Sequence, residues 1–313
     1  MKKIIVTADD YGAHDYIDRG IAMAAEAGCV NTVSCIVTFA RAEESIKKFA
    51  DYCRKRNLDI NLGIHISLTA GKPLLGSEAN SLTNNDKKFM NVNYFDYDKI
   101  NPLEVYHEAD KQIETLKKII ENEGLKLDHI TSHHGIMTLF PDFLKIYLLL
   151  AAKYNVPVRN PVLISREKIW GFRSSPMKRE GMYRGFKILR NEGVEQVLIN
   201  TTTISVKSLK SNLHVFNNGI VKYPDHFIDT FYKNGSAKRL KKILKYLPDS
   251  QKSEMVVHLG NGEYNDSPEE WEQYNGINFE YFKGRKQELN TIVNELNLKN
   301  YMNNISSVSM SVY

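Results

Sequence analysis

Acidic and imidazole side chains stand at the ends of four short apolar segments of this 313-residue sequence. The residues that share this position are Asp9, Asp10, His65, His133 and His258. Imidazole nitrogens and a carboxylate, with positions left open for water, are the ligands of a catalytic divalent metal ion. Zinc fits this donor set best, and manganese, magnesium, cobalt and nickel are also compatible with it. The pattern indicates one divalent metal site, provided that the fold brings these segment ends together.

Two of these residues, Asp9 and Asp10, are adjacent and lie within Thr7-Ala8-Asp9-Asp10-Tyr11-Gly12. Neighbouring side chains at the end of a strand point to different sides, so the two carboxylates can take different roles. One can bind a metal ion while the other accepts a proton from the water that the metal activates. The alternative is that one of them caps the following helix, and the spacing alone does not decide between these interpretations.

Three histidines fall within six residues in the segment His129-Ile130-Thr131-Ser132-His133-His134. Because alternate side chains of a strand share one face, His129, Thr131 and His133 should point together and His134 away from them. His129 would then lie deeper in the fold than His133. For His65 and His258 the alternative is a hydrogen-bonded place in the core, which the sequence leaves open.

The elements that must position these residues alternate between β-branched runs and amphipathic segments. Strands are expected at residues 3–8, 30–37, 59–68, 127–132, 157–160, 197–200, 212–215, 254–259 and 305–309. Helices are expected at residues 17–27, 42–56, 102–123, 143–154, 182–190, 227–232, 236–246 and 279–296. This alternation predicts an α/β fold with parallel strands, and about seven such units favour an irregular TIM-like barrel that forms a single domain over residues 1–313. Such folds place their sites at the carboxyl ends of the strands.

A stretch rich in Asn, Asp and Gly at residues 71–101 shows little periodicity. We expect it to form a long loop, and a loop of this length in a compact domain is more often functional than idle.

The composition argues against several classes of protein. The net charge is only +5, and the densest basic run, at residues 238–242, has the spacing of a solvated helix face, so neither nucleic-acid nor membrane binding is expected. The three cysteines include no C-x-x-C pair, which fits a reducing compartment and argues against a thiolate zinc site. No apolar run approaches ~18 residues, and the apolar run after Met1 is too short for a signal peptide. A cytoplasmic protein is therefore expected.

Along nearly its whole length, the chain resembles the YdjC-like carbohydrate deacetylase family, which includes chitooligosaccharide deacetylases. The motifs that carry the resemblance are, in chain order, Thr7-Ala8-Asp9-Asp10-Tyr11-Gly12, Gly28-x-Val30-x-Thr32-x-Ser34, Gly63-Ile64-His65-Ile66-Ser67-Leu68-Thr69, Gly71-Lys72-Pro73-Leu74, His129-Ile130-Thr131-Ser132-His133-His134, Val156-Pro157-Val158-Arg159, Glu254-Met255-Val256-Val257-His258-Leu259-Gly260 and Arg285-x-x-Glu288-Leu289. Four positions depart from the family pattern. They are Thr131 in place of an aspartate, Gly135 and Met137 in place of histidines, and Leu259 in place of a proline.

The resemblance implies an irregular TIM-like barrel that is often dimeric. It also implies roles for the site residues: Asp10, His65 and His133 as metal ligands, Asp9 as general base and His258 as general acid. The proposed ligands are retained, whereas the four departures alter their surroundings, which orient ligands and tune the bound water. They bear on the substrate and the activity more than on metal binding.

The working hypothesis is therefore hydrolysis of an N-acetyl group from an amino sugar or a small oligosaccharide. Arg159, at the end of the expected strand at residues 157–160, would hold Asp9 or a polar group of the substrate, with a surface salt bridge as the alternative. Four aromatic residues of the long loop could stack on sugar rings, although packing against the core is the more common role for such side chains. They are Phe89, Tyr94, Phe95 and Tyr97. The rival hypotheses are metal-dependent hydrolysis of another amide or a phosphoester, and a binding or regulatory relative without turnover.

Overall fold

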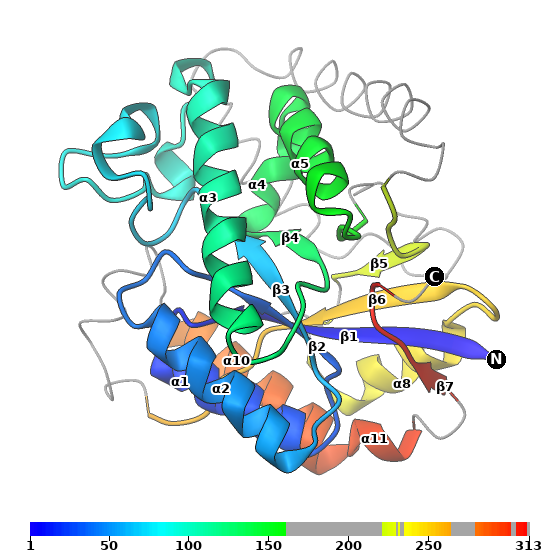
Figure 1. Cartoon of the computed structure of the whole chain (residues 1–313). Coiled ribbons are helices and arrows are strands. Elements are labelled where there is room, and N and C mark those ends of the chain that lie inside the picture. The colour runs from blue at the N-terminus through cyan, green and yellow to red at the C-terminus, as the bar shows by residue number, and fades with distance from the viewer. Residues whose placement is uncertain (161–220, 230, 232–234, 264–278, 302–304, 312–313) are drawn as a thin grey trace.

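The structure is a computed structural model that describes residues 1–160, 221–229, 231, 235–263, 279–301 and 305–311 (Figure 1). The strands expected at residues 197–200 and 212–215 and the helix expected at residues 182–190 lie outside the described residues.

The described strands form one parallel sheet in the order β4-β3-β2-β1-β6-β5, and β7 also pairs with β1. Their bounds are β1 Lys2–Tyr11, β2 Thr32–Cys35, β3 Asn61–Ile66, β4 Ile130–Ser132, β5 His226–Ile228, β6 Lys252–Val257 and β7 Ile305–Ser307. The sheet is curled and resembles half of a barrel (Figure 1). This confirms the parallel α/β architecture, whereas the closed TIM-like barrel and the division into a single domain stay predictions.

The two faces of the sheet differ in chemistry because side chains alternate along a strand. In β1 the apolar side chains of Ile4, Val6 and Ala8 belong to the hydrophobic core, and the buried polar residues Thr7 and Asp9 alternate with them. Strand β3 repeats the pattern, because Leu62, Ile64 and Ile66 join the core and the residues between them do not. The other face of the sheet is therefore free to carry the polar residues of a site.

Helices cover the outside of the curled sheet, with α1, α2 and α8 along its lower side and α3 and α5 above it in Figure 1. Their bounds are α1 Asp15–Glu26, α2 Ala42–Arg56, α3 Pro102–Glu121, α4 Ile136–Leu139, α5 Pro141–Tyr154, α8 Ala237–Tyr246, α10 Phe279–Asn290 and α11 Leu298–Tyr301. Local signals define their ends. Asn101 accepts the N–H of Leu103 at the start of α3, whose first residue is Pro102. Ser236 accepts the N–H of Arg239 at the start of α8. The basic residues of α8 lie opposite its buried Leu240, Ile243 and Leu244, as expected for a solvated helix face.

Three expected elements differ from those observed. Phe227 and Ile228, at the start of the helix expected at residues 227–232, instead belong to β5, which pairs with β6, and residues 230 and 232 lie outside the described residues. In the helix expected at residues 279–296, the α-helical part α10 ends at Asn290, and a π-helical turn follows over Thr291–Glu295. The strand expected at residues 157–160 is reduced to one parallel bridge between Val158 and Ile130.

Residues 71–101 form a loop that contains four short 3₁₀ helices, at Gly76–Glu78, Asn80–Leu82, Val92–Tyr94 and Tyr97–Lys99. The buried carboxylate of Glu108 in α3 anchors its start by accepting the N–H groups of Leu74 and Leu75 at 3.0 Å. The packing role holds for Phe89 and Phe95, which are buried, whereas Tyr94 is 80% exposed.

Among the described residues, no single helix is long and apolar enough to cross a membrane, although the bent pair at residues 133–139 and 142–154 meets this criterion by length and composition when taken together. The three cysteines all lie in the described part of the chain, where they are buried and form no disulfide.

One edge of β1 is shared by two strands. Strand β2 pairs with its second half, and β7 pairs with Lys2, Lys3 and Ile4. Asn31 joins the two pairings, since its Oδ1 accepts the N–H of Val6 at 2.7 Å and its Nδ2 donates to the carbonyl of Val308 at 3.0 Å. The first and last described strands therefore lie side by side.

Candidate metal centre

The end of β1 is bulged at Asp10. Asp9 pairs with Ser34 and Tyr11 with Cys35 of β2, so Asp10 is the extra residue, and its φ is +78°. A positive φ costs a non-glycine residue about 1–3 kcal/mol of strain. β-Bulges redirect side chains and are common next to functional sites. The helix-cap interpretation is wrong for both aspartates, because α1 is capped by His14, whose Nδ1 accepts the N–H of Tyr16 at 3.0 Å.

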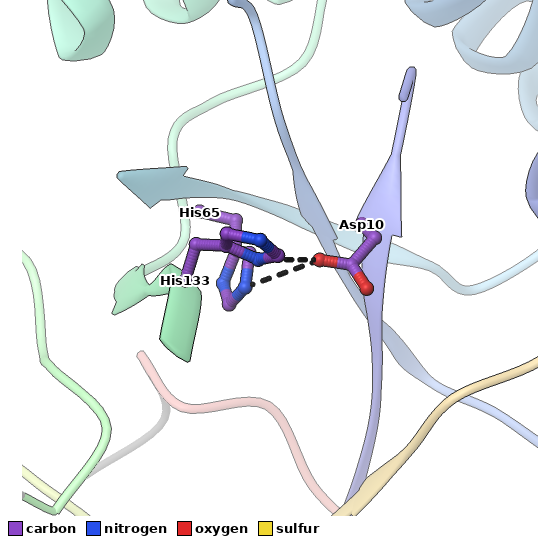
Figure 2. Close-up of side chains that lie close together, drawn as sticks. All are labelled: Asp10, His65 and His133. Atoms are coloured by element: carbon purple, nitrogen blue, oxygen red, sulfur yellow. Dashed lines mark hydrogen bonds and ion pairs between the residues drawn. The ribbon is translucent and has the colours of Figure 1, made fainter. Parts of the chain in front are cut away.

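Asp10, His65 and His133 come together from three separate elements. Asp10 Oδ1 lies 3.0 Å from His133 Nδ1 and 3.3 Å from His65 Nε2, and Figure 2 shows both rings turned toward this one oxygen. The side chains are at most 4% exposed. One donor atom from each residue lies within 4.8 Å of the others, so the group could hold a metal ion.

The tautomer of His65 follows from its neighbour Thr131. The Thr131 hydroxyl donates to the carbonyl of Ile64 at 3.1 Å, so it can only accept from His65 Nδ1, which is 2.7 Å away. This places the proton of His65 on Nδ1 and leaves the lone pair on Nε2, on the side of Asp10. Such a hydrogen bond on the second ring nitrogen is what orients metal-binding histidines in general. Thr131 therefore supplies this contact where the family pattern has an aspartate.

The other histidines of this segment do not join the group. His134 is exposed and bonds through Nδ1 to Thr69 Oγ1 at 2.9 Å. His129 is fully buried, with Nε2 at 2.9 Å from Ser34 Oγ and Nδ1 at 3.0 Å from Asp128 Oδ2. Ser34, His129 and Asp128 thus follow one another in the Ser-His-Asp order of serine hydrolases. Ser34 and His129 are wholly buried, however, and have no access to a substrate. They form a polar network beneath the site.

Asp9 is held by an arginine. Arg159 donates from Nη1 to Asp9 Oδ2 at 2.7 Å and from Nη2 to Asp9 Oδ1 at 2.9 Å, and its Nε donates to Glu254 at 2.8 Å. Burial by itself would raise the pKa of Asp9, but the charge and hydrogen bonds of Arg159 hold this pKa well below its ordinary value. His65 Nε2 is 3.8 Å from Asp9 Oδ2, so Asp9 adjoins the group. Since its donors are directed at two carboxylates, the geometry favours the first role considered for Arg159, that of holding Asp9.

His258 follows β6 and has a half-buried side chain. Its backbone N–H donates to Glu288 Oε2 at 2.8 Å. Burial, followed by the positive charge of Arg285, lowers the pKa of His258 to about 4. Asp9 and Asp10 act on this pKa in the opposite direction, so all three groups share one electrostatic environment.

Two buried charged residues of this region were missed as functional candidates. Glu254 on β6 is fully buried beside Arg159, and Arg285 on α10 is fully buried beside Asp10. A signal for Arg285 exists in the sequence, because it falls between Phe282 and Leu289 at helical spacing and so occupies the apolar face of its helix.

A family model for YdjC-like proteins matches residues 3–296 of this chain. The chain belongs to the YdjC-like family. The matched range contains the whole Asp10, His65 and His133 group together with Asp9, Arg159 and His258. The resemblance inferred from the motifs is thereby confirmed.

Several relatives of this YdjC-like chain are named carbohydrate deacetylase, among them proteins from Enterococcus faecalis and Oceanobacillus iheyensis. The protein from Enterococcus faecalis is 28% identical over 270 residues, which are 83% of this chain and 95% of the relative. The protein from Oceanobacillus iheyensis is 31% identical over 175 residues, which are 54% of this chain and 72% of the relative. A crystal structure from Enterococcus faecalis, described as a cellobiose-phosphate cleavage protein, has a TM-score of 0.66 at 22% identity and covers 98% of this chain and 97% of its own. This likeness supports the fold.

Proposed function

We propose that this chain is a metal-dependent hydrolase that removes N-acetyl groups from amino sugars or small oligosaccharides. The buried group of Asp10, His65 and His133 is the observation that carries the proposal, because nothing in the packing of a core requires two imidazoles and a carboxylate with their donor atoms turned toward one another. The names of the relatives from Enterococcus faecalis and Oceanobacillus iheyensis support the carbohydrate as substrate.

The donor set fits a divalent ion. Two imidazoles and one carboxylate are typical of catalytic zinc, and the same set also accepts manganese or magnesium, so zinc is the first ion to test. An ion held there would act as a Lewis acid on the acetamide carbonyl and lower the pKa of a water molecule. The residues supply the rest of the chemistry.

Asp9 is the proposed proton acceptor. It is ionised at neutral pH because Arg159 stabilises its charge, and the bidentate contact fixes both of its oxygens. A low pKa makes a carboxylate a weak base, so Asp9 is suited to accept a proton only from a water that is already acidified. The role of Asp9 as proton acceptor therefore requires that the neighbouring group of Asp10, His65 and His133 holds a metal ion.

His258 is the proposed donor to the leaving amine. With a pKa lowered to about 4, its ring is neutral at pH 7. The proton that reaches the amine nitrogen must then originate from the attacking water, pass to the site residues and be delivered as the C–N bond breaks. Asp9 and His258 together move one proton from water to amine, which balances the hydrolysis of an amide to a carboxylic acid and an amine.

The test is acetate release from a panel of N-acetylated amino sugars and short oligosaccharides, measured after EDTA treatment and after return of zinc, manganese or magnesium. We expect acetate from at least one sugar, lost with EDTA and restored by one of these ions. Turnover of a different amide or of a phosphoester in a parallel panel would favour the rival hydrolase. A protein that binds metal and sugar but releases no product would favour a binding or regulatory role.

A further inference from the structure

The two carboxylate oxygens of Asp10 have different surroundings. Oδ1 lies between His133 Nδ1 at 3.0 Å and His65 Nε2 at 3.3 Å, whereas Oδ2 accepts a hydrogen bond from the guanidinium of Arg285. Figure 2 shows the second oxygen turned away from both rings. One side of the carboxylate is therefore available to a shared ligand group, and the other is engaged by a cation.

Arg285 is itself fixed in place. It is fully buried in α10 and donates from Nη1 to the carbonyl of Leu259 at 3.3 Å and from Nη2 to the hydroxyl of Tyr281. Its guanidinium packs 4.7 Å from the centre of the Tyr281 ring. One turn further along α10, Glu288 accepts the backbone N–H of His258. The same helix thus holds the ends of both β1 and β6.

Charge alone does not explain this arginine. A buried cation next to a site for a divalent cation repels that ion, and burying the guanidinium also carries a desolvation cost. Arg285 can orient the Asp10 carboxylate, because a planar guanidinium held at several points fixes the plane of the carboxylate that it contacts. Asp10 needs such a restraint, since it projects from a strained bulge.

We propose that Arg285 is a positioning residue that holds Asp10 Oδ2 and so presents Oδ1 alone to the site of His65 and His133. Asp10 then serves as a ligand through one oxygen, which leaves coordination positions open for water and substrate. The inference rests on the proposed metal site and adds to it a residue that acts through Asp10.

The experiment compares metal-free wild-type protein with the variants Arg285→Lys and Arg285→Gln, by calorimetric titration with Zn²⁺ and by the visible spectrum of the Co²⁺-loaded protein. Loss of a residue that orients a ligand typically lowers metal affinity about 10–100-fold. We expect Arg285→Gln to lower the Zn²⁺ affinity by an amount in this range and to alter the Co²⁺ spectrum. The Zn²⁺ affinity of Arg285→Lys should lie between those of Arg285→Gln and wild type, because an ammonium group keeps the charge but lacks the planar pair of donors of a guanidinium.

The matched control is Arg41→Gln, which breaks another arginine–aspartate pair, with Asp18, outside the ligand group. It should lower the urea midpoint of the metal-free protein without changing Zn²⁺ affinity or the Co²⁺ spectrum. Wild-type Zn²⁺ affinity in Arg285→Lys overturns the proposal, whether or not Arg285→Gln folds. Equal losses of affinity in the Arg41 and Arg285 variants overturn it as well, because they indicate general destabilisation. A wild-type protein that binds no divalent ion would instead refute the metal site itself.

Discussion

Asp9 and Asp10 are neighbours in the chain, yet each is paired with a different arginine. Arg159 contacts both oxygens of Asp9, and Arg285 contacts one oxygen of Asp10. Asp10→Asn should lose metal and activity together, because a neutral amide is a poor ligand for a divalent ion. Asp9→Asn should keep metal and lose about 10²–10⁴-fold in rate, since an amide cannot accept the proton. The measurement is metal content and acetate release on both proteins.

Both variants should fold, which circular dichroism checks. A metal-free Asp9→Asn protein beside a metal-loaded Asp10→Asn protein would reverse the two roles, and full metal in both would place the ion elsewhere.

The histidines give a second contrast at this scale. His65→Ala and His133→Ala should each lower zinc occupancy sharply, because each removes a nitrogen next to Asp10 Oδ1. His134→Ala is the matched control, since His134 adjoins His133 in the chain but is exposed. Elemental analysis of the purified proteins provides the measurement. Equal zinc loss in all three variants would contradict the assignment of His133 over its neighbour.

The sequence led to His65, His133 and Asp10 because each lies at or next to the carboxyl end of a strand, and these ends of parallel strands meet at one edge of a sheet. It did not lead to the role of Arg285. That contact spans 275 residues and depends on how α10 packs against the sheet, which local periodicity does not encode.

At the scale of single elements, β3 has a space requirement at Gly63. A Cβ atom there would lie 2.3 Å from Cε1 of His129, whose ring is held at both nitrogens by Ser34 and Asp128. Gly63→Ala should therefore lower the free energy of unfolding by about 1–3 kcal/mol, the usual cost of overpacking. Urea denaturation measures the change.

The matched control is Gly284→Ala in α10, where a Cβ atom would meet nothing within 4 Å. This variant should be more stable than wild type by about 0.5–1 kcal/mol, because alanine is the better helix former. If Gly63→Ala is as stable as wild type, the His129 ring is not fixed as described.

The elements themselves were predictable to different degrees. Helix α2 was expected at residues 42–56 and is observed at Ala42–Arg56, because its apolar residues recur at helical spacing over four turns. Phe227 and Ile228 of strand β5 were expected to begin a helix. The apolar run of β5 is too short for periodicity to distinguish a helix from a strand, and its pairing with β6 decides the outcome.

At the scale of the whole molecule, Asp128 connects the beginning of β4 to the last described residues. Ser311 donates to its Oδ1, and His129 contacts its Oδ2. Burial alone would raise the pKa of Asp128, but the hydrogen bond and charge of His129 outweigh it and lower this pKa. A lowered folded-state pKa gives stability that is present above the unfolded value of about 3.9 and is lost as the pH falls through the folded value.

Asp128→Asn should therefore be less stable than wild type at pH 7, with a difference in unfolding free energy that narrows below about pH 4. Urea denaturation at several pH values follows this difference. A difference in unfolding free energy between wild type and Asp128→Asn that stays constant down to about pH 3 would show that the carboxylate charge is not the source of the stability.

The pairing of β7 with β1 has a consequence for biosynthesis. Arg285 is translated 275 residues after Asp10, and β7 is translated later still. At about 5–20 residues per second, this delay lasts between about 14 and 55 seconds. For that time the nascent chain carries a β1 whose edge at Lys2–Ile4 has no β7 beside it, an exposed template for pairing with other chains. The contact of Arg285 with Asp10 can therefore form only after α10 has been synthesised, long after Asp10, His65 and His133 are all present in the nascent chain.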